Sequence, residues 1–298
     1  MSSRRSQLEY ARRLHAVLDH IDRHLDAKLD LATLASVANF SPFHFHRIFR
    51  ALTGEALGDY LRRRRLEVAA TRLRAQRRLS VLQVALGVGF GSAEAFTRAF
   101  RARFGCAPSI WRHSKRGQGP SKPSQAPPKS GRDHRGSNKE SPMNVKLVDL
   151  QPVSVAYLRH VGPYGPETST FWMKKVAPWM AANGLFGRDR YGVSLDDPAI
   201  VTPSKCRYHA CVASHEQEIL TGDPGHKVIP GGRYASLSYE GTSANIGSAW
   251  DQMLSEWLPR SGLQLDARPF FEHYPANGRF DPNTGVFTCN ICLPVAPL

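Results

Sequence analysis

The sequence lacks long apolar runs and a disulfide framework. No run of about 18 apolar residues occurs, so we expect no membrane-spanning segment. The first residues, MSSRRSQLEYARRL, are charged and contain no apolar region, so we expect no secretory signal. The five cysteines are odd in number and widely spread, which predicts free thiols in a reducing compartment. These absences predict a cytoplasmic protein without a membrane partner.

The spacing of the cysteines also argues against a metal site. Cys289 and Cys292 form a CxxC pair, but a zinc site needs two further ligands at matching spacing. Only Cys206 and Cys211 offer a loose second pair. The segment FTCNICLPV has the pattern of a strand, which directs the two thiols of the CxxC to opposite faces. With no nucleophile elbow and no nucleotide-binding loop either, we predict no metal, no cofactor and no catalytic residue.

The positive charge is concentrated in the first third of the chain. The whole sequence has 298 residues and a net charge of +15. Residues 1–116 carry +13 of this charge, whereas residues 144–298 carry −1. A concentrated positive field favours phosphates, because binding releases their counterions. Length and charge asymmetry together predict two domains, of which the first binds nucleic acid.

The stretch FSPFHFHRIFRAL, residues 40–52, predicts a short helix with two different faces. Ser41 is a good N-cap, and Pro42 then occupies the first helical position, where its missing N–H costs nothing. The core-facing positions at helical spacing are Phe45, Ile48, Phe49 and Leu52. The other face carries aromatic and cationic side chains that a DNA major groove accepts, namely Phe43, His46, Arg47 and Arg50. Taken alone, the stretch fits an ordinary surface helix with a solvated basic face equally well.

The same pattern recurs further along the chain as FGSAEAFTRAFRARFG, residues 90–105. Phe45 and Arg47 of the first copy align with Phe96 and Arg98 of the second. The preceding segments match as well, LATLASVANF against VLQVALGVGF. Each copy is therefore predicted to be a helix, a tight turn and a second helix, which is the helix-turn-helix signature. A tandem pair is more specific than one copy and favours DNA binding.

A long basic helix is predicted between the two copies, over residues 57–76. Its buried side can be lined by Leu57, Tyr60, Leu61, Leu66, Ala69, Ala70 and Leu73. Arginines crowd the remaining surface, including the run Arg62 to Arg65. Such a helix, rising about 1.5 Å per residue, spans roughly 30 Å, close to the roughly 34 Å of one turn of B-DNA. We therefore expect it to place the two copies in successive major grooves of one duplex.

A set of motifs runs through residues 8–114: the tandem repeat, the pattern GxxLxxYLRxRRLxxA, Phe90 and the tail GCAPSIWR. Together they resemble the DNA-binding domain of AraC/XylS transcription regulators. The resemblance implies an all-α domain with two helix-turn-helix motifs. It implies base contacts from exposed positions of the two recognition helices, which are Phe43, His46, Arg47, Ala93, Glu94, Thr97 and Arg98. We add Arg50 and Arg101 as further DNA-binding residues. Ala93 departs from the family pattern, because it offers only apolar contact. Arg62 to Arg65 are expected to contact phosphates or acidic neighbours.

Residues 115–143 contain many Pro, Ser, Gly and Lys residues and almost no apolar side chain. Such a composition predicts a flexible linker. Its length predicts that the domains before and after it are loosely coupled in space.

The second domain, residues 144–298, contains its own internal repeat. Residues 155–185, VAYLRHVGPYGPETSTFWMKKVAPWMAANGL, align with residues 234–263, YASLSYEGTSANIGSAWDQMLSEWLPRSGL. Each copy predicts a strand, a helix stopped by glycine and then a strand pair. We therefore predict an α+β domain with a pseudo-two-fold repeat. Trp179 and Trp257 occupy matched helical positions and are predicted to be core.

Three further motifs of this domain, VGPY, RPFFEHY and the closing CLPV, resemble the GyrI-like small-molecule-binding family. The resemblance implies that Glu272 is the carboxylate of a ligand pocket. On a strand, Phe270, Glu272 and Tyr274 share one face. We add Tyr164 and Trp250 as pocket walls. A carboxylate among aromatic walls suits an apolar cation, whereas an exposed strand residue is the alternative for Glu272.

These observations predict a one-component transcription regulator and favour an activator. Its partners are then double-stranded promoter DNA, a small-molecule effector and RNA polymerase. Two alternatives stay open. Some GyrI-like proteins resemble hydrolases, so Glu272 with Tyr164 or Tyr274 would act as a general base, and DNA binding would serve autoregulation. The other alternative is a protein that compacts nucleic acid through charge alone.

Overall fold

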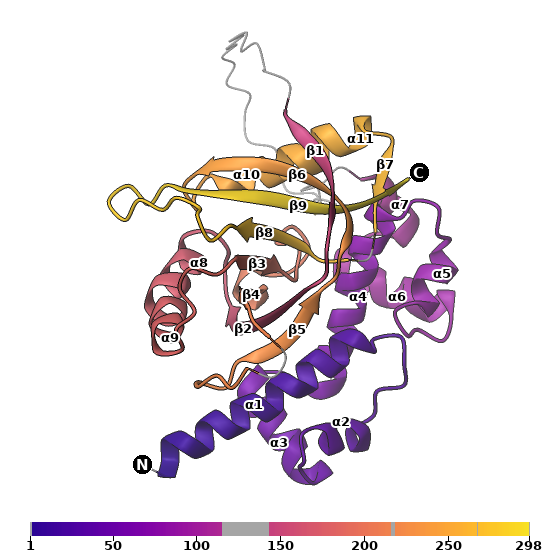
Figure 1. Ribbon diagram of the computed structural model, residues 1–298. Helices are drawn as coiled ribbons and strands as arrows, with labels where there is room; N and C mark the ends of the chain where they lie inside the picture. Colours follow the sequence, from indigo (N-terminus) through magenta and orange to yellow (C-terminus); the bar gives the residue numbers. More distant parts are fainter. Residues whose placement is uncertain (1, 115–142, 216–217, 267, 298) are drawn as a thin grey trace, which may run out of the picture.

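The computed structural model describes residues 2–114, 143–215, 218–266 and 268–297, and Figure 1 shows their arrangement. The predicted linker lies outside the described residues except for Met143. A helical part precedes a curved antiparallel sheet with helices packed on it, which confirms the predicted fold classes and their order. Among the described residues, no helix has both the length and the apolar character that crossing a membrane requires.

The helical part contains the predicted tandem repeat. Along residues 2–114 the chain forms α1 (Ser2–Arg23), α2 (Leu31–Val37), α3 (Pro42–Thr53), α4 (Leu57–Ala75), α5 (Val81–Leu86), α6 (Ala93–Phe104) and α7 (Pro108–His113). The pairs α2–α3 and α5–α6 are the two helix-turn-helix motifs, and α4 is the long helix between them. Every apolar position predicted for the buried side of α4 is buried.

The recognition helices α3 and α6 begin and end in the same way. Ser41 and Ser92 each accept a hydrogen bond from a backbone N–H in the first turn that follows. Gly54 and Gly105 end the helices in the left-handed conformation, both with a φ of 75°. A side chain with a Cβ is strained there, so glycine is the natural stop. The same caps explain why both copies form helices of 12 residues.

Each motif packs its own core against a different stretch of α4. Phe45 and Phe49 of α3 lie in a cluster with α1 and α2, whereas Phe96 and Phe100 of α6 lie in a cluster with α5 and α7. One core prediction is wrong, because Leu52 is 51% exposed. Helical spacing places Leu52 on the core side of α3. Spacing does not show whether another element covers that side as far as the last turn of the helix.

The second part is built on one curved sheet with the strand order β1-β6-β9-β8-β3-β4-β2-β5, and β7 pairs with β9. The pairs are antiparallel. The strands are β1 (Val145–Leu150), β2 (Val153–Val161), β3 (Arg190–Ser194), β4 (Arg207–Ala213), β5 (Gly225–Ile229), β6 (Gly232–Gly241), β7 (Leu263–Leu265), β8 (Phe270–Tyr274) and β9 (Phe287–Pro297).

Two broken helices follow matched strands, as the internal repeat predicts. After β2 come α8 (Pro166–Phe171), the π-helical turn η1 (Trp172–Val176) and α9 (Ala177–Ala182). After β6 come α10 (Ile246–Gln252), the π-helical turn η3 (Met253–Trp257) and α11 (Leu258–Arg260). Trp179 and Trp257 pack in the clusters that these helices form with the sheet, although Trp257 is only partly buried.

The cysteines of the CxxC pair lie on opposite faces of the sheet. Cys289 belongs to the cluster beneath the second broken helix, and Cys292 belongs to the cluster on the other face. The five cysteines are free thiols and all are buried. The strand pattern therefore predicted the placement of this pair correctly.

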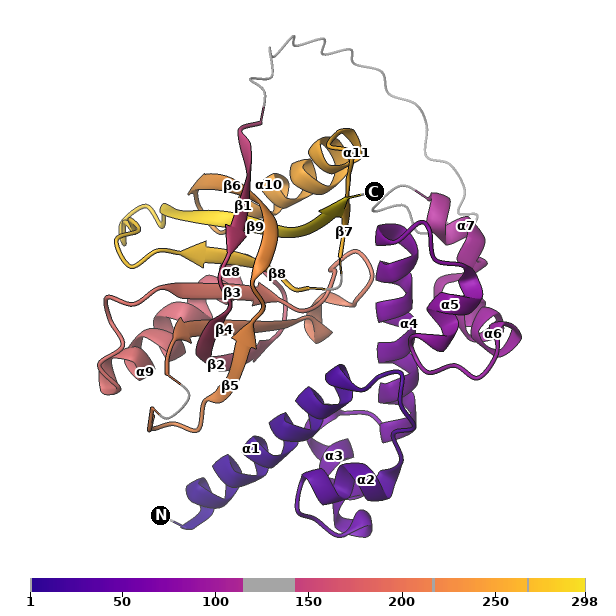
Figure 2. The same cartoon turned by 45° about the vertical axis from the view of Figure 1, so that its right-hand side comes forward.

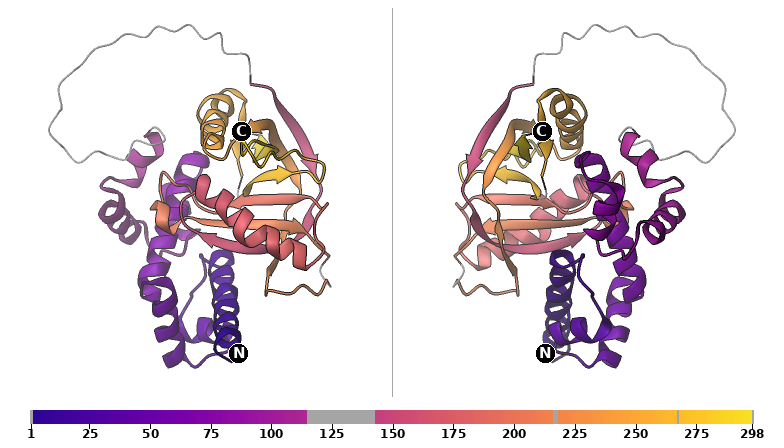
Figure 3. Two further views of the ribbon diagram at one scale, coloured as in Figure 1. Left: turned by 90° about the vertical axis from the view of Figure 1, so that its left-hand side faces the viewer. Right: turned by 90° about the vertical axis from the view of Figure 1, so that its right-hand side faces the viewer.

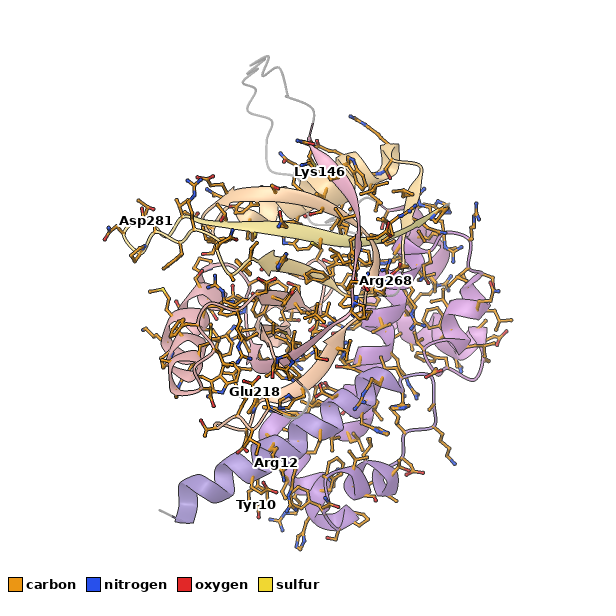
Figure 4. The ribbon with its side chains drawn as sticks, viewed as in Figure 1. Tyr10, Arg12, Lys146, Glu218, Arg268 and Asp281 are labelled. Carbon is orange, nitrogen blue, oxygen red and sulfur yellow. The ribbon has the colours of Figure 1, made fainter. Side chains whose placement is uncertain are left out.

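The two parts lie against each other. Figures 2 and 3 show α1 and α4 next to the sheet, with α2–α3 near one end of α4 and α5–α6 beside the other. Lys146 and Asp281 lie on the outside of the sheet, away from the helical part (Figure 4). The expectation of loose coupling is wrong, since buried ion pairs join the parts, including Arg64 to Asp196 at 2.7 Å. The length of a linker limits how far apart two domains can be. It does not determine whether their surfaces bind each other.

Candidate nucleic-acid interface and effector pocket

The first recognition helix, α3, presents a cationic side to solvent. His46, Arg47 and Arg50 are exposed on the side opposite its buried phenylalanines. The side chain of Phe43 lies outside the described part of the structure. Arg can bind the O6 and N7 edge of guanine, so this side of α3 has the chemistry of a major-groove reader.

The second recognition helix, α6, mixes charges on its outer side. Glu94, Arg98 and Arg101 are exposed, whereas Ala93 and Thr97 are partly buried. The backbone N–H of Glu94 and the hydroxyl of Ser92 lower the pKa of the Glu94 carboxyl, so this group is an anion at neutral pH. An anionic acceptor fits the amino group of cytosine. The outer side of α3 therefore presents arginine donors, whereas that of α6 presents an anionic acceptor beside arginine donors.

Two arginines of the run on α4 bind acidic neighbours, as predicted. Arg63 pairs with Glu55 at 2.6 Å and with Glu67 at 3.0 Å. Arg64 is 4% exposed and pairs with Asp196 of the sheet domain. These two guanidinium groups are therefore engaged in ion pairs within the protein.

Arg65 ties α4 to the connection between α1 and α2. Its guanidinium donates to the backbone carbonyls of Leu25 and Ala27, at 3.0 and 2.9 Å. Gly89, from the turn of the second motif, lies directly against this junction, because an added Cβ would be 2.5 Å from the carbonyl oxygen of Leu25. Arg62 stays exposed and is the member of the run best placed for phosphate.

A cavity of about 2060 Å³ opens between the helical part and the broken helices of the sheet domain. It exceeds an ordinary ligand site of roughly 300–1,000 Å³, because it includes the groove between the two parts. The structure brings all predicted ligand-binding residues to its wall, which are Tyr164, Trp250, Phe270, Glu272 and Tyr274. Trp250 stacks on Phe270, with ring centroids 6.0 Å apart.

Glu272 is a buried carboxylate ringed by aromatic donors. It is 7% exposed, which excludes the exposed-strand alternative. The indole N–H of Trp250 donates to Oε1 at 3.1 Å, and the hydroxyl of Tyr274 donates to Oε2 at 2.9 Å. Burial raises the pKa of Glu272, and the hydrogen bonds offset only part of that effect. The surrounding donors are neutral, so an entering cation is the partner that would balance the charge.

Gly192 makes room for this arrangement. It lies on β3 directly opposite Glu272 of β8. A Cβ at this position would lie 2.1 Å from the hydroxyl oxygen of Tyr208 and 2.6 Å from Oε2 of Glu272. Glycine therefore lets the tyrosine and the carboxylate approach each other across the strand.

Comparisons with known proteins match both parts of the chain. The family described as GyrI-like small molecule binding domain matches residues 143–296, and a helix-turn-helix domain family matches residues 34–114. The chain belongs to the GyrI-like family. It combines a GyrI-like domain for small molecules with a helix-turn-helix domain of AraC type, and it is a DNA-binding transcription regulator.

Several known proteins are similar to parts of this chain. The regulatory protein SoxS of Escherichia coli strain K12 is 39% identical over 31% of this chain and 86% of SoxS. The Right origin-binding protein of the same strain is 40% identical over 32% of this chain and 32% of that protein. The DNA-binding domain of AdpA, solved with a target DNA, is 35% identical over 33% of this chain and 88% of that one, with a TM-score of 0.32.

Two residues of the GyrI-like pocket escaped the sequence analysis. The hydroxyl of Tyr208 lies 3.4 Å from Oε2 of Glu272, and the indole N–H of Trp172 donates to that hydroxyl at 3.0 Å. The internal repeat could have identified Trp172, because the alignment that pairs Trp179 with Trp257 also pairs Trp172 with Trp250. Tyr208 lies on strand β4, where all residues but the last are buried, so its pattern does not distinguish pocket from core.

Tyr164 connects the pocket wall to the domain boundary. Its hydroxyl donates to the backbone carbonyl of Arg207 at 2.7 Å and lies 3.2 Å from that of Asp196. Burial raises the pKa of the Tyr164 phenol, so the group is a neutral donor at physiological pH. The residues that this hydroxyl binds belong to the ion pairs between the two parts.

Metal chemistry finds little support among the side chains that the structure describes. In that part of the chain, no group of three or more His, Cys, Asp or Glu side chains could hold a metal ion. Burial raises the pKa of the Cys206 thiol to about 12 and that of Cys211 to about 11. These two cysteines are therefore protonated and inert at neutral pH.

Proposed function

We propose that the chain is a cytoplasmic transcription activator that reads promoter DNA with both recognition helices and responds to an apolar cation in its GyrI-like pocket. The observation that carries the ligand class is Glu272, a buried carboxylate among aromatic rings and neutral donors. Attraction between a cation and aromatic faces adds to the charge attraction. Activation requires contact with RNA polymerase, which we include in the proposal.

For DNA, we propose base contacts from α3 and α6. Arg47 and Arg98 would bind guanine edges, and Glu94 would accept from cytosine. Support comes from the equivalent placement of Arg47 and Arg98 in the two copies of the repeat. His46, Arg50 and Arg101 lie beside them, and Ala93, Thr97 and Phe43 complete the proposed surface.

The DNA proposal is tested with a cognate site selected from a random pool by the full chain. Arg47→Ala should weaken binding to this site by about tenfold or more, and binding to random DNA much less, because a base contact is worth about 1–3 kcal/mol. Arg62→Ala is the matched control, since an exposed phosphate contact should weaken both DNAs equally. Equal losses on both DNAs for Arg47→Ala would reject the base contact and favour binding by charge alone.

The ligand proposal is tested by titrating the full chain with tetraphenylphosphonium, an apolar aromatic cation, in a calorimeter. Wild-type protein should bind it, and Glu272→Gln, which keeps the shape and removes the charge, should bind it at least about tenfold more weakly. If Glu272→Gln binds the cation as tightly as wild type, then Glu272 does not recognise the cation.

A hydrolase remains the second candidate, and the raised pKa of Glu272 is the observation that favours it. A carboxylate with a raised pKa is a better general base near neutral pH. The hydroxyls of Tyr208 and Tyr274 would then orient a substrate. Incubating reactive esters and epoxides with the full chain separates the candidates. Product that depends on Glu272 supports catalysis, and complete recovery of every compound supports a binding site alone.

A further inference from the structure

The connection between β3 and β4, residues 195–206, touches both helix-turn-helix units, and we call it the brace. It contains the short turn η2 (Pro203–Lys205) and holds its own shape. The backbone N–H groups of Ile200 and Val201 both donate to the carbonyl of Asp197, at 2.9 and 2.8 Å. The brace is therefore an ordered element, so that a displacement at one of its ends can move the other end.

Asp196 anchors the brace to the helical part through buried charges. Its side chain is 1% exposed and binds Arg64 of α4 at 2.7 Å and Arg207 of β4 at 2.9 Å. Arg207 also pairs with Asp22, close to the end of α1. Burial alone would raise the pKa of Asp196, but the charges of Arg64 and Arg207 outweigh burial and lower it. All these groups are therefore ionised at neutral pH.

Two further contacts hold the first unit, α1–α3. Lys205 of the brace reaches Glu55, just after α3, at 3.2 Å. On the neighbouring strand β2, both Arg159 and Tyr157 bind the carboxylate of Asp19 on α1. The first unit is thus fixed to the sheet domain at several points along α1 and at the end of α3.

The brace reaches the second unit, α5–α7, through an apolar side chain. Ile200 is 7% exposed and belongs to the buried cluster of α4–α7, which includes Leu73, Phe100 and Trp111. That cluster is the core beneath the second recognition helix. A single short segment of the sheet domain therefore contacts the first unit by charge and the second unit by packing.

Buried ion pairs favour one geometry more than they add net stability. Their desolvation cost is about as large as their attraction, but a displaced partner leaves a charge buried and unpaired. A displacement of Ile200 in the core of the second unit is equally unfavourable, because small shifts in a closely packed core lose van der Waals contacts. The brace therefore resists any change in the orientation of α3 relative to α6.

The brace is also joined to the effector pocket. Tyr164 lies on the cavity wall, and its hydroxyl binds the backbone on both sides of the brace, at Asp196 and Arg207. Asp196, Pro198 and Pro203 line the same cavity. A ligand that displaces the ring of Tyr164 must move the ends of the brace or break these hydrogen bonds.

We propose that the brace positions the two helix-turn-helix units relative to each other, so that it sets the half-site spacing that the protein reads, and that pocket occupancy changes this spacing through Tyr164. The second half of this statement rests on the proposed ligand-binding function. The first half concerns DNA binding without ligand and can be judged alone.

The spacing proposal is tested with the full chain on operators in which one or two base pairs are added or removed between the half-sites. One base pair rotates a half-site by about 35°, so a rigid pair of readers should lose about tenfold in affinity on a mis-spaced site. Ile200→Ala removes the packing contact of the brace with the second unit, and Lys205→Ala removes its charged contact with the end of α3. Each variant should flatten this profile to within about threefold. Lys205 is 43% exposed, so its variant should fold even if the other does not.

Asp149→Asn is the control, because Asp149 is 69% exposed and pairs with the exposed Arg233 on the outer strands. It should keep the wild-type profile. If folded Ile200→Ala or Lys205→Ala protein keeps the wild-type spacing preference, the brace does not position the two units. The same conclusion follows if wild-type protein binds all spacings equally.

The ligand link is tested with Tyr164→Phe, which keeps the ring and removes the hydroxyl. Tetraphenylphosphonium should change the spacing profile of wild-type protein, and it should leave the profile of Tyr164→Phe unchanged at a concentration that calorimetry shows to saturate the variant. A wild-type response in Tyr164→Phe, or a bound ligand without any change in the wild-type profile, would overturn the link. If wild type does not bind the cation at all, the ligand class fails, and the spacing profiles still decide the brace.

Discussion

At the scale of single residues, the pocket depends on a carboxylate whose charge is expensive to bury. Glu272 has three donors around it and still has a raised pKa, because neutral donors replace only part of the lost water. The protonation state of such a group therefore depends on what occupies the site. A cation stabilises the carboxylate, and an empty apolar site favours the protonated acid.

Cation binding should therefore depend on pH through Glu272. Because its folded-state pKa is raised above 4.5, acidification protonates it and weakens cation binding, and affinity should recover as the pH rises through that pKa. Protonation should not loosen the fold, since a raised carboxyl pKa contributes stability at low pH and loses it as the pH rises. Calorimetric titration of tetraphenylphosphonium across this range checks the sign. Affinity independent of pH in wild type, or equal pH dependence in Glu272→Gln, would contradict it.

Gly192 gives a second prediction at this scale. Gly192→Ala should push Tyr208 and Glu272 apart, because its Cβ would be 2.1 Å from the tyrosine hydroxyl. We expect cation affinity to fall by about tenfold in the same titration. Gly247→Ala is the control, because Gly247 lies on the cavity wall and a Cβ there meets nothing within 4 Å. An unchanged affinity in Gly192→Ala would show that the pocket does not need this close approach.

At the scale of elements, α4 is a support with different chemistry along its length. Its apolar side joins two cores, Arg63 and Arg64 bind acids, and Arg65 holds the α1–α2 connection through backbone carbonyls. The turn of the second motif closes on this last junction at Gly89. The second motif is therefore seated against the first unit as well as on α4.

The turn at Gly89 should be intolerant of any side chain. Gly89→Ala places a Cβ 2.5 Å from a backbone oxygen and forces a φ of +82° on alanine. We expect a loss of more than about 1 kcal/mol in the free energy of unfolding, measured by urea denaturation. Gly91→Ala is a matched control two positions along, where a Cβ meets nothing within 4 Å. Similar stability for both variants would show that the junction can relax.

At the scale of the whole molecule, the two domains share charges that neither could bury alone. Asp22 on α1 and Arg64 on α4 meet Asp196 and Arg207 of the GyrI-like domain. Burial works against the ionised form of Asp22, and the charges of Arg207 and Arg64 outweigh it and lower its pKa. The domains should therefore unfold as one unit.

Asp196→Asn should separate the two domains in thermal unfolding. The change leaves Arg64 and Arg207 buried with less countercharge, which costs about 3–5 kcal/mol when one partner of a buried pair is removed. We expect a lower, broader or split transition by calorimetry, in place of the single wild-type transition. Asp149→Asn, in the exposed pair with Arg233, should stay within about 0.5 kcal/mol of wild type. A single wild-type transition in Asp196→Asn would show that the domains are not coupled by these charges.

The sequence by itself determined the local elements and their kinds. The Ser41 cap, Pro42 and helical spacing predicted α3, and the repeat predicted that α6 would be like it. Strand alternation placed Glu272 beside Phe270 and Tyr274, and it separated Cys289 from Cys292. These features depend on neighbours within one element or one repeat, which is the range over which a pattern in the chain carries information.

Only the tertiary structure decided which surfaces meet. The pairing of Arg64 with Asp196 joins residues 132 positions apart, and the composition of the linker suggested no such contact. The exposure of Leu52 and the position of Tyr208 against Glu272 likewise depend on how separate elements pack. Charge and apolar patterns show that a side chain needs a partner, but the partner is chosen by the packing of the whole chain.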